Sequence, residues 1–143
     1  MDIARGDLAG ARVKLEKAAA STQRQSNAVE DMLLLLHERE LDNAYYAAKD
    51  VELQGRLEEA FTSYVALAES SPGFRDVKER TADLRLRIDE AKKAYDAGAA
   101  AEANGDVEGA ITHFTTVLLY WPRYQDTAAR LAKLRASREV NRG

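Results

Sequence analysis

Apolar side chains recur along most of the chain at the three- and four-residue spacing of an amphipathic helix, and no segment shows the strict alternation of a strand. Alanine, glutamate, lysine and arginine fill most of the intervening positions, and all four are strong helix formers. Glycine or proline interrupts the pattern at Gly6, Gly55, Pro72, Gly105 and Pro122. We therefore predict an all-α chain, with helices over about residues 8–20, 28–54, 56–70, 75–104, 107–120 and 124–139.

The N-terminal part is predicted to contain two separate helices after a short helical end. Gly6 is expected to end a helix over residues 1–5, because glycine commonly follows a helix C-terminus. The polar segment 21–26 is expected to be a connector. Residues 28–54 contain no glycine or proline, so they predict one helix about 40 Å long at roughly 1.5 Å per residue. Because Met32–Leu36 is apolar all round this helix, we expect it to pack on more than one side.

The segment from Gly55 to Asp76 recurs without a gap, 50 residues later, from Gly105 to Asp126. Matched pairs include Ala60 with Ala110, Tyr64 with Phe114, Pro72 with Pro122 and Arg80 with Arg130. A worn third copy begins at Gly6, and Gln23 stands where its proline is expected. Self-similarity at a fixed period is the signature of a repeat array. We divide the single domain 1–143 into a partial repeat (1–23), two repeats (24–73 and 74–123) and a partial repeat or C-terminal capping helix (124–143).

The spacing inside each copy resembles that of tetratricopeptide repeats, in which A-x₃-F is followed eight residues later by proline. The matching residues are Ala60, Tyr64 and Pro72 in one copy, and Ala110, Phe114 and Pro122 in the other. Gly98 matches the glycine of the family pattern, whereas smaller residues occupy its tryptophan and tyrosine positions. The resemblance implies a TPR-like right-handed α-solenoid of antiparallel helix pairs, with long first helices and short second helices.

The unit of 50 residues is longer than the family's unit of about 34, and the additional residues precede each first helix. We expect them to lengthen that helix. A bend near residues 89–92, which makes three helices per unit, is the alternative. The chain also begins near the end of one predicted long helix and finishes partway along another. A fragment of a longer array, or a unit that associates end to end, is expected to have such boundaries.

Composition narrows the functional classes. The 143 residues carry 21 basic and 24 acidic side chains, and this net charge of −3 provides no basic footprint for nucleic acid. The absence of cysteine excludes disulfides and thiolate metal sites. No apolar run has the length of a membrane span, and the N-terminus has no signal-peptide core. We expect a cytoplasmic protein without a nucleic-acid partner or a membrane span.

The sequence contains no recognisable catalytic motif. The two histidines, His37 and His113, are 76 residues apart on different predicted helices, and neither has a carboxylate at the spacing of HExxH. No glycine-rich phosphate loop occurs, and no glutamate and histidine have the spacing of a di-iron bundle. We expect no enzyme activity, no metal and no cofactor.

The resembled family suggests where a partner binds, because one face of its first helix lines a groove that receives peptides. On this chain that face carries Asp42, Tyr45, Lys49, Lys92 and Tyr95. Packing of both tyrosines between helices is an equally good interpretation. Trp121 is a further interface candidate if it is exposed, and packing against the last helix is its alternative.

We therefore predict a protein–protein interaction scaffold or adaptor that binds a partner peptide or helix through the repeat surface. One alternative is a structural element that stacks end to end through its terminal repeats and so forms a homo-oligomer. The other is a regulatory repeat segment of a larger bacterial multidomain protein, such as a signalling kinase.

Overall fold

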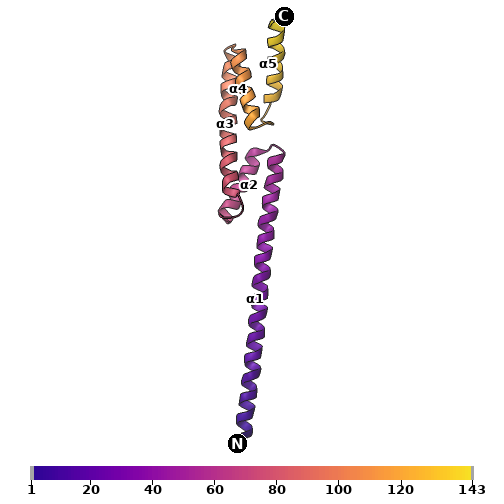
Figure 1. Ribbon diagram of the computed structural model, residues 1–143, viewed down its shortest axis with the longest axis vertical. Helices are drawn as coiled ribbons and strands as arrows, with labels where there is room; N and C mark the ends of the chain where they lie inside the picture. The colour runs from indigo at the N-terminus through magenta and orange to yellow at the C-terminus, as the bar shows by residue number, and fades with distance from the viewer. Residues whose placement is uncertain (1, 143) are drawn as a thin grey trace. The chain divides into compact units, whose positions relative to one another are not determined.

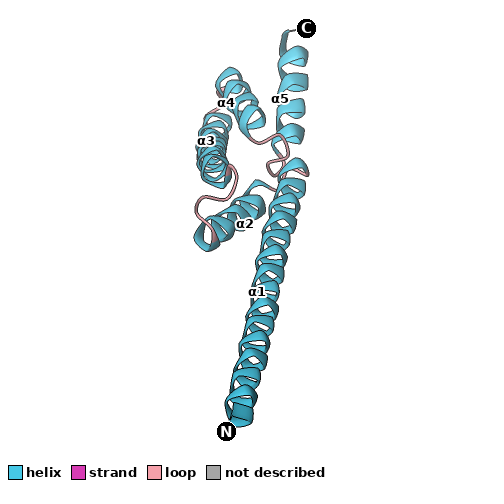
Figure 2. Cartoon of the chain, turned by 60° about the horizontal axis from the view of Figure 1, so that its bottom comes forward, coloured by secondary structure: helices cyan, strands magenta, loops and turns pink. Residues whose placement is uncertain are grey.

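A computed structural model describes residues 2–142 of the chain, and the side chains of residues 10–141 (Figure 1). The helices are α1 (Asp2–Leu53), α2 (Leu57–Ser70), α3 (Val77–Ala103), α4 (Val107–Tyr120) and α5 (Thr127–Arg142). No strand occurs within residues 2–142, so the predicted all-helical fold class is confirmed (Figure 2). The chain divides into two compact units, Met1–Asp42 and Asn43–Gly143, and α1 contributes to both.

The predicted helix breaks near the N-terminus are wrong, because α1 is continuous from Asp2 to Leu53. Gly6 and the polar segment 21–26 both lie inside it. Polar side chains of this segment find partners within the helix: the Thr22 hydroxyl donates to the Ala18 carbonyl at 3.0 Å, and the Gln23 amide donates to the Asn27 amide at 3.1 Å. One glycine costs a helix only about 1 kcal/mol, which the surrounding helix formers offset.

The apolar block of α1, Met32–Leu36, is exposed and not packed as we expected. The side chains of Met32–Leu36 are between 47% and 63% exposed, so the expectation that they pack on more than one side is wrong. The unit that ends at Asp42 consists of α1 alone, so it contains no second element that could cover this block. Farther along the same helix, Ala44 and Ala47 are exposed as well, whereas Ala48 is buried.

From Gly55 onward the predicted helices all occur, as α2, α3, α4 and α5. α3 is a single helix, so the alternative bend near residues 89–92 does not occur. It packs against both α2 and α4, and α4 packs against α5 (Figure 1). The core of the second unit consists of apolar side chains from all five helices, among them Ala48, Leu57, Ala60, Tyr64, Leu67, Val77, Leu84, Ala91, Ala110, Phe114, Val117 and Leu131.

α3 and α5 begin slightly later than predicted, at Val77 and Thr127. The turns that precede them contain Arg75 and Gln125, whose φ angles are 44° and 45°. An α-helix of L-residues requires a negative φ, so neither helix can start before these residues. The same turn geometry therefore recurs 50 residues apart.

At Gly98, α3 approaches α4 closely, because a Cβ atom there would lie 2.8 Å from the ring of Phe114. Phe114 is fully buried, so its ring cannot withdraw into solvent. Overpacking a core costs roughly 1–3 kcal/mol, whereas alanine gains about 1 kcal/mol over glycine inside a helix. We expect Gly98→Ala to lower the free energy of unfolding, by up to about 2 kcal/mol, in urea titrations followed by circular dichroism.

The Phe114→Leu background is the control for this variant. Because leucine leaves room for the added methyl group, Gly98→Ala should cost less there than in the native chain. If Gly98→Ala leaves the urea midpoint of the native chain unchanged, or raises it, the tight contact is contradicted.

Candidate functional site

A polar network joins the last turns of α1 to the start of α3. The Tyr45 hydroxyl donates to Asp76 Oδ1 at 2.6 Å. Arg80 Nε donates to the Tyr45 hydroxyl oxygen at 2.9 Å and to Asp76 Oδ2 at 3.0 Å. Arg80 Nη1 also donates to Glu52 Oε2 at 3.1 Å. One guanidinium therefore holds two residues of α1 and the residue that precedes α3.

The same network recurs between α3 and α5, built from residues 50 positions later. The Tyr95 hydroxyl donates to Asp126 Oδ1 at 2.8 Å. Arg130 Nη1 donates to the Tyr95 hydroxyl oxygen at 2.9 Å, and Arg130 Nη2 donates to Glu102 Oε1 at 2.8 Å. Each of these four residues is of the same type as its counterpart in the first network.

Aromatic rings flank each guanidinium in the same way. The carbon of the Arg80 guanidinium lies 5.6 Å from the centre of the Tyr45 ring and 5.9 Å from that of Tyr64. In the second network the equivalent distances are 5.4 Å to Tyr95 and 4.9 Å to Phe114. A cation over a ring gains roughly 0.5–1 kcal/mol at exposed sites and more where water is excluded. The rings therefore favour the charged arginine that the hydrogen bonds require.

The first network has well-defined protonation states. The hydrogen bond from Tyr45 lowers the pKa of Asp76, and the same hydrogen bond, together with burial, raises the pKa of Tyr45. Burial disfavours the charged form of Arg80, but its hydrogen bond with Tyr45 and the neighbouring charges leave its pKa raised. Burial raises the pKa of Tyr64 to about 12. At neutral pH the network thus combines a carboxylate, a cation and neutral tyrosines.

Both tyrosines that were predicted to bind a partner take part in these networks. Tyr45 is buried and Tyr95 is half-buried, and both hydroxyls bond to a carboxylate and an arginine. Asp42 and Lys49 lie half-buried on α1, and Asp42 is the last residue of the first unit. Lys92 is exposed on α3 and forms an ion pair with Glu58 of α2.

Trp121, the remaining candidate, is buried in the turn between α4 and α5. Its indole Nε1 donates to the carbonyl of Gly55 at 2.7 Å, and its ring lies 4.5 Å from that of Tyr124. Arg123 Nη1 donates to the carbonyl of Gln54 at 2.9 Å. These two side chains therefore connect the turn after α4 to the turn after α1.

Sequence patterns pointed to both tyrosines but assigned no function to their hydrogen-bonding partners. Asp76 with Asp126, and Arg80 with Arg130, stood out only as matched positions of the two copies. Glu52 and Glu102 also match at the same offset of 50. Recurrence of a tyrosine, a glutamate, an aspartate and an arginine in fixed order was the signal that could have revealed the network.

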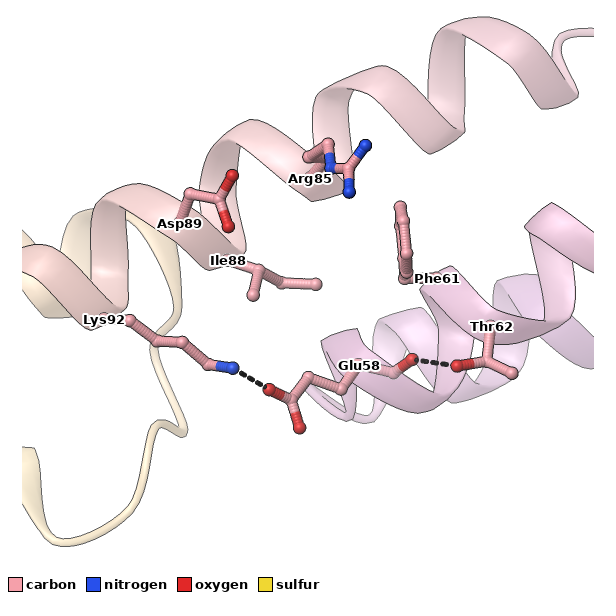
Figure 3. Close-up of a pocket in the computed structure, with 7 residues that line it drawn as sticks. All are labelled: Glu58, Phe61, Thr62, Arg85, Ile88, Asp89 and Lys92. Carbon is pink, nitrogen blue, oxygen red and sulfur yellow. Dashed lines mark hydrogen bonds and ion pairs between the residues drawn. The ribbon is translucent and has the colours of Figure 1, made fainter.

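A groove lies between α2 and α3, and Lys92 is one of the residues that line it (Figure 3). Its volume is about 320 Å³, and its walls are formed by Glu58, Phe61, Thr62, Arg85, Ile88, Asp89 and Lys92. The Arg85 guanidinium lies 5.7 Å from the centre of the Phe61 ring. Arg85 is exposed and has no ion-pair partner among the side chains described. The groove thus offers an apolar wall beside an available cation.

Comparisons with known proteins identify no relative: no protein-family model, no curated protein and no solved structure matches the chain. Across residues 2–142, none of the helices combines the length and the apolar character needed to cross a membrane.

Removal of one network cation should destabilise the fold. Arg80→Met retains an apolar stem but leaves Asp76, Glu52 and Tyr45 without their shared donor. Hydrogen bonds to charged groups each contribute about 1.5–3 kcal/mol, so we expect a loss of roughly 2 kcal/mol in the free energy of unfolding, measured with urea. Arg85→Met, a matched change at an exposed arginine of the same helix, should cost less than about 0.5 kcal/mol. Equal losses for the two variants would show that the network contributes nothing specific.

The network should also make stability depend on pH in the acid range. The pKa of Asp76 is lowered from 3.8 in the folded chain. The contribution of Asp76 to stability is therefore complete above pH 3.8 and is lost as the pH falls through the lowered pKa. We therefore expect the urea midpoint of the native chain to decline more steeply than that of Asp76→Asn as the pH falls below about 4. Asp50→Asn, at an exposed position of α1, is the control and should keep the native slope. The interpretation fails if the Asp76→Asn slope matches the native one.

Proposed function

We propose that this chain is a protein-interaction scaffold built from TPR-like repeats of 50 residues. In this proposal the repeats form a right-handed α-solenoid of antiparallel helix pairs, and the repeat surface binds a partner peptide or helix without catalysis. The recurring networks support the repeat assignment, because hydrogen-bond partners, ring contacts and turn residues all recur at the same offset. A repeated frame of this kind holds a binding surface in a constant shape.

We assign the partner to the groove between α2 and α3. Phe61 and Ile88 supply apolar contacts, and the Lys92–Glu58 ion pair joins the two helices across the groove (Figure 3). Groove binding of this type uses apolar anchors for affinity and a few polar groups for orientation. The occupant that fits is a helix or extended peptide carrying an apolar side chain next to a carboxylate.

This assignment rests on the position of Arg85 over the ring of Phe61. Stacking on Phe61 restricts the guanidinium before any partner arrives, so less conformational entropy is lost on binding. A planar guanidinium can bind a carboxylate through two parallel hydrogen bonds, which adds directional specificity. An exposed arginine that lies over an aromatic ring and has no ion-pair partner among residues 10–141 is therefore suited to recognising an acidic residue.

The proposal is tested by selecting peptides from a random display library against the full chain, and then titrating one selected peptide by fluorescence anisotropy. We expect selected peptides to share an acidic residue beside an apolar one. Arg85→Glu should weaken binding by at least about tenfold, because it replaces a charge-assisted hydrogen bond with repulsion between like charges.

Arg135→Glu is the matched control, since it makes the same charge change 50 residues later, where Ile111 stands in place of Phe61. Its affinity for the peptide should stay within about twofold of that of the native chain. Peptides that bind Arg85→Glu as tightly as the native chain, or that lose affinity equally with Arg135→Glu, would contradict the groove assignment.

A further inference from the structure

One face of α1 carries a continuous seam within the unit that ends at Asp42, where residues 10–40 are all exposed. Its positions alternate between spacings of four and three residues, which is the heptad pattern of a coiled coil. The seam consists of Ala11, Leu15, Ala18, Thr22, Gln25, Val29, Met32 and Leu36, and all eight are exposed. Leu15 is 71% exposed, and Val29 and Met32 are 59% and 58% exposed. Six apolar positions in a heptad pattern on an uncovered helix face indicate a missing helical neighbour.

From this seam we propose that α1 binds α1 of a second copy of the chain in antiparallel orientation. This interaction is separate from the groove assigned above and does not depend on it. In the proposed register, Ala11 faces Leu36 of the second copy, Leu15 faces Met32, and Ala18 faces Val29. Every apolar seam residue then meets an apolar one.

The sizes of these side chains select the antiparallel orientation. In two of the three apolar layers a small alanine faces a larger residue, so no layer consists of two alanines. A parallel, in-register pair would place Ala11 against Ala11 and Ala18 against Ala18, leaving gaps beside crowded leucine layers. A shift of one heptad in the antiparallel pair would set Leu15 against Arg39 and Val29 against Gln25.

The two polar seam residues lie at the centre of the proposed pair. Thr22 of each copy faces Gln25 of the other, so the hydroxyl and the amide can hydrogen-bond across the symmetry axis. A polar layer in a coiled coil fixes register at some cost in stability. Thr22 and Gln25 therefore disfavour the shifted registers, in which each would face an apolar residue.

The charges of α1 favour the same orientation. Residues 10–24 contain four basic side chains and one acidic side chain, whereas residues 25–40 contain four acidic and one basic. An antiparallel pair places the basic half of each helix along the acidic half of the other, and a parallel pair places like charges together. The chain is thus complementary to a second copy of itself in both volume and charge.

Because the native chain lacks cysteine, single cysteines can test this orientation. Leu15→Cys and Met32→Cys should form a disulfide when the two variants are mixed and oxidised, since these positions face each other. Each variant alone should cross-link poorly, because its two cysteines would be about 25 Å apart at roughly 1.5 Å per residue, far beyond disulfide reach. Efficient cross-linking of each variant with itself would overturn the antiparallel orientation.

Mass against concentration, measured by sedimentation equilibrium on the full chain, tests association itself. We expect the native mass to rise from 15.8 kDa towards twice that value. Met32→Glu should raise the dimer dissociation constant by at least about tenfold, whereas Leu34→Glu, on the opposite side of the helix, should change it by less than about threefold. A constant 15.8 kDa would overturn the proposal, as would equal effects of the two variants. We expect Met32→Glu to leave binding of the selected peptide unchanged. This measurement distinguishes failure of the dimer proposal from failure of the groove assignment.

Discussion

One arginine guanidinium in each copy joins the two helices on either side of a short helix: Arg80 joins α3 to α1, and Arg130 joins α5 to α3. Arg80 bonds simultaneously to a tyrosine hydroxyl, an aspartate and a glutamate, and Arg130 holds the equivalent tyrosine and glutamate. A planar group with five donors can hold acceptors from different elements at once, which the compact ammonium group of lysine cannot do in the same geometry. The flanking aromatic rings shield this charge, so the helix approach is set by directional bonds and not by apolar contact alone.

Side chains of the turn after α4 connect the two copies. Trp121 and Arg123 bond to the carbonyls of Gly55 and Gln54, so the turn after α4 is fastened to the turn after α1. Gly55 has a φ of 84°, and a Cβ atom there would lie 2.7 Å from Arg123, so both conformation and space require glycine. At Gly105, one copy later, no described atom lies within 4 Å of such a Cβ. The connection is therefore made once within the described residues.

Local patterns predicted the helices from Gly55 onward because glycine and proline mark helix ends directly. The left-handed turn residues Arg75 and Gln125 carry no such signal, and they delay the starts of α3 and α5. The same patterns failed near the N-terminus, since a polar run such as 21–26 contains no residue that prevents helix formation. Tyr45 and Tyr95 were predicted as partner-binding residues. Their bonding to Arg80 and Arg130 joins residues 35 apart, which helix periodicity cannot reveal. Exposure of Met32–Leu36 was missed because apolar character predicts burial without identifying the neighbour.

The central claim is that the tyrosine and the arginine of each network are coupled, and that the coupling is the same in both copies. A double-mutant cycle of Tyr95→Phe with Arg130→Met, compared with the cycle of Tyr45→Phe with Arg80→Met, measures it in urea unfolding. The account predicts a coupling free energy of about 1 kcal/mol or more in each cycle, equal within roughly 0.5 kcal/mol. A coupling free energy near zero in either cycle would contradict it.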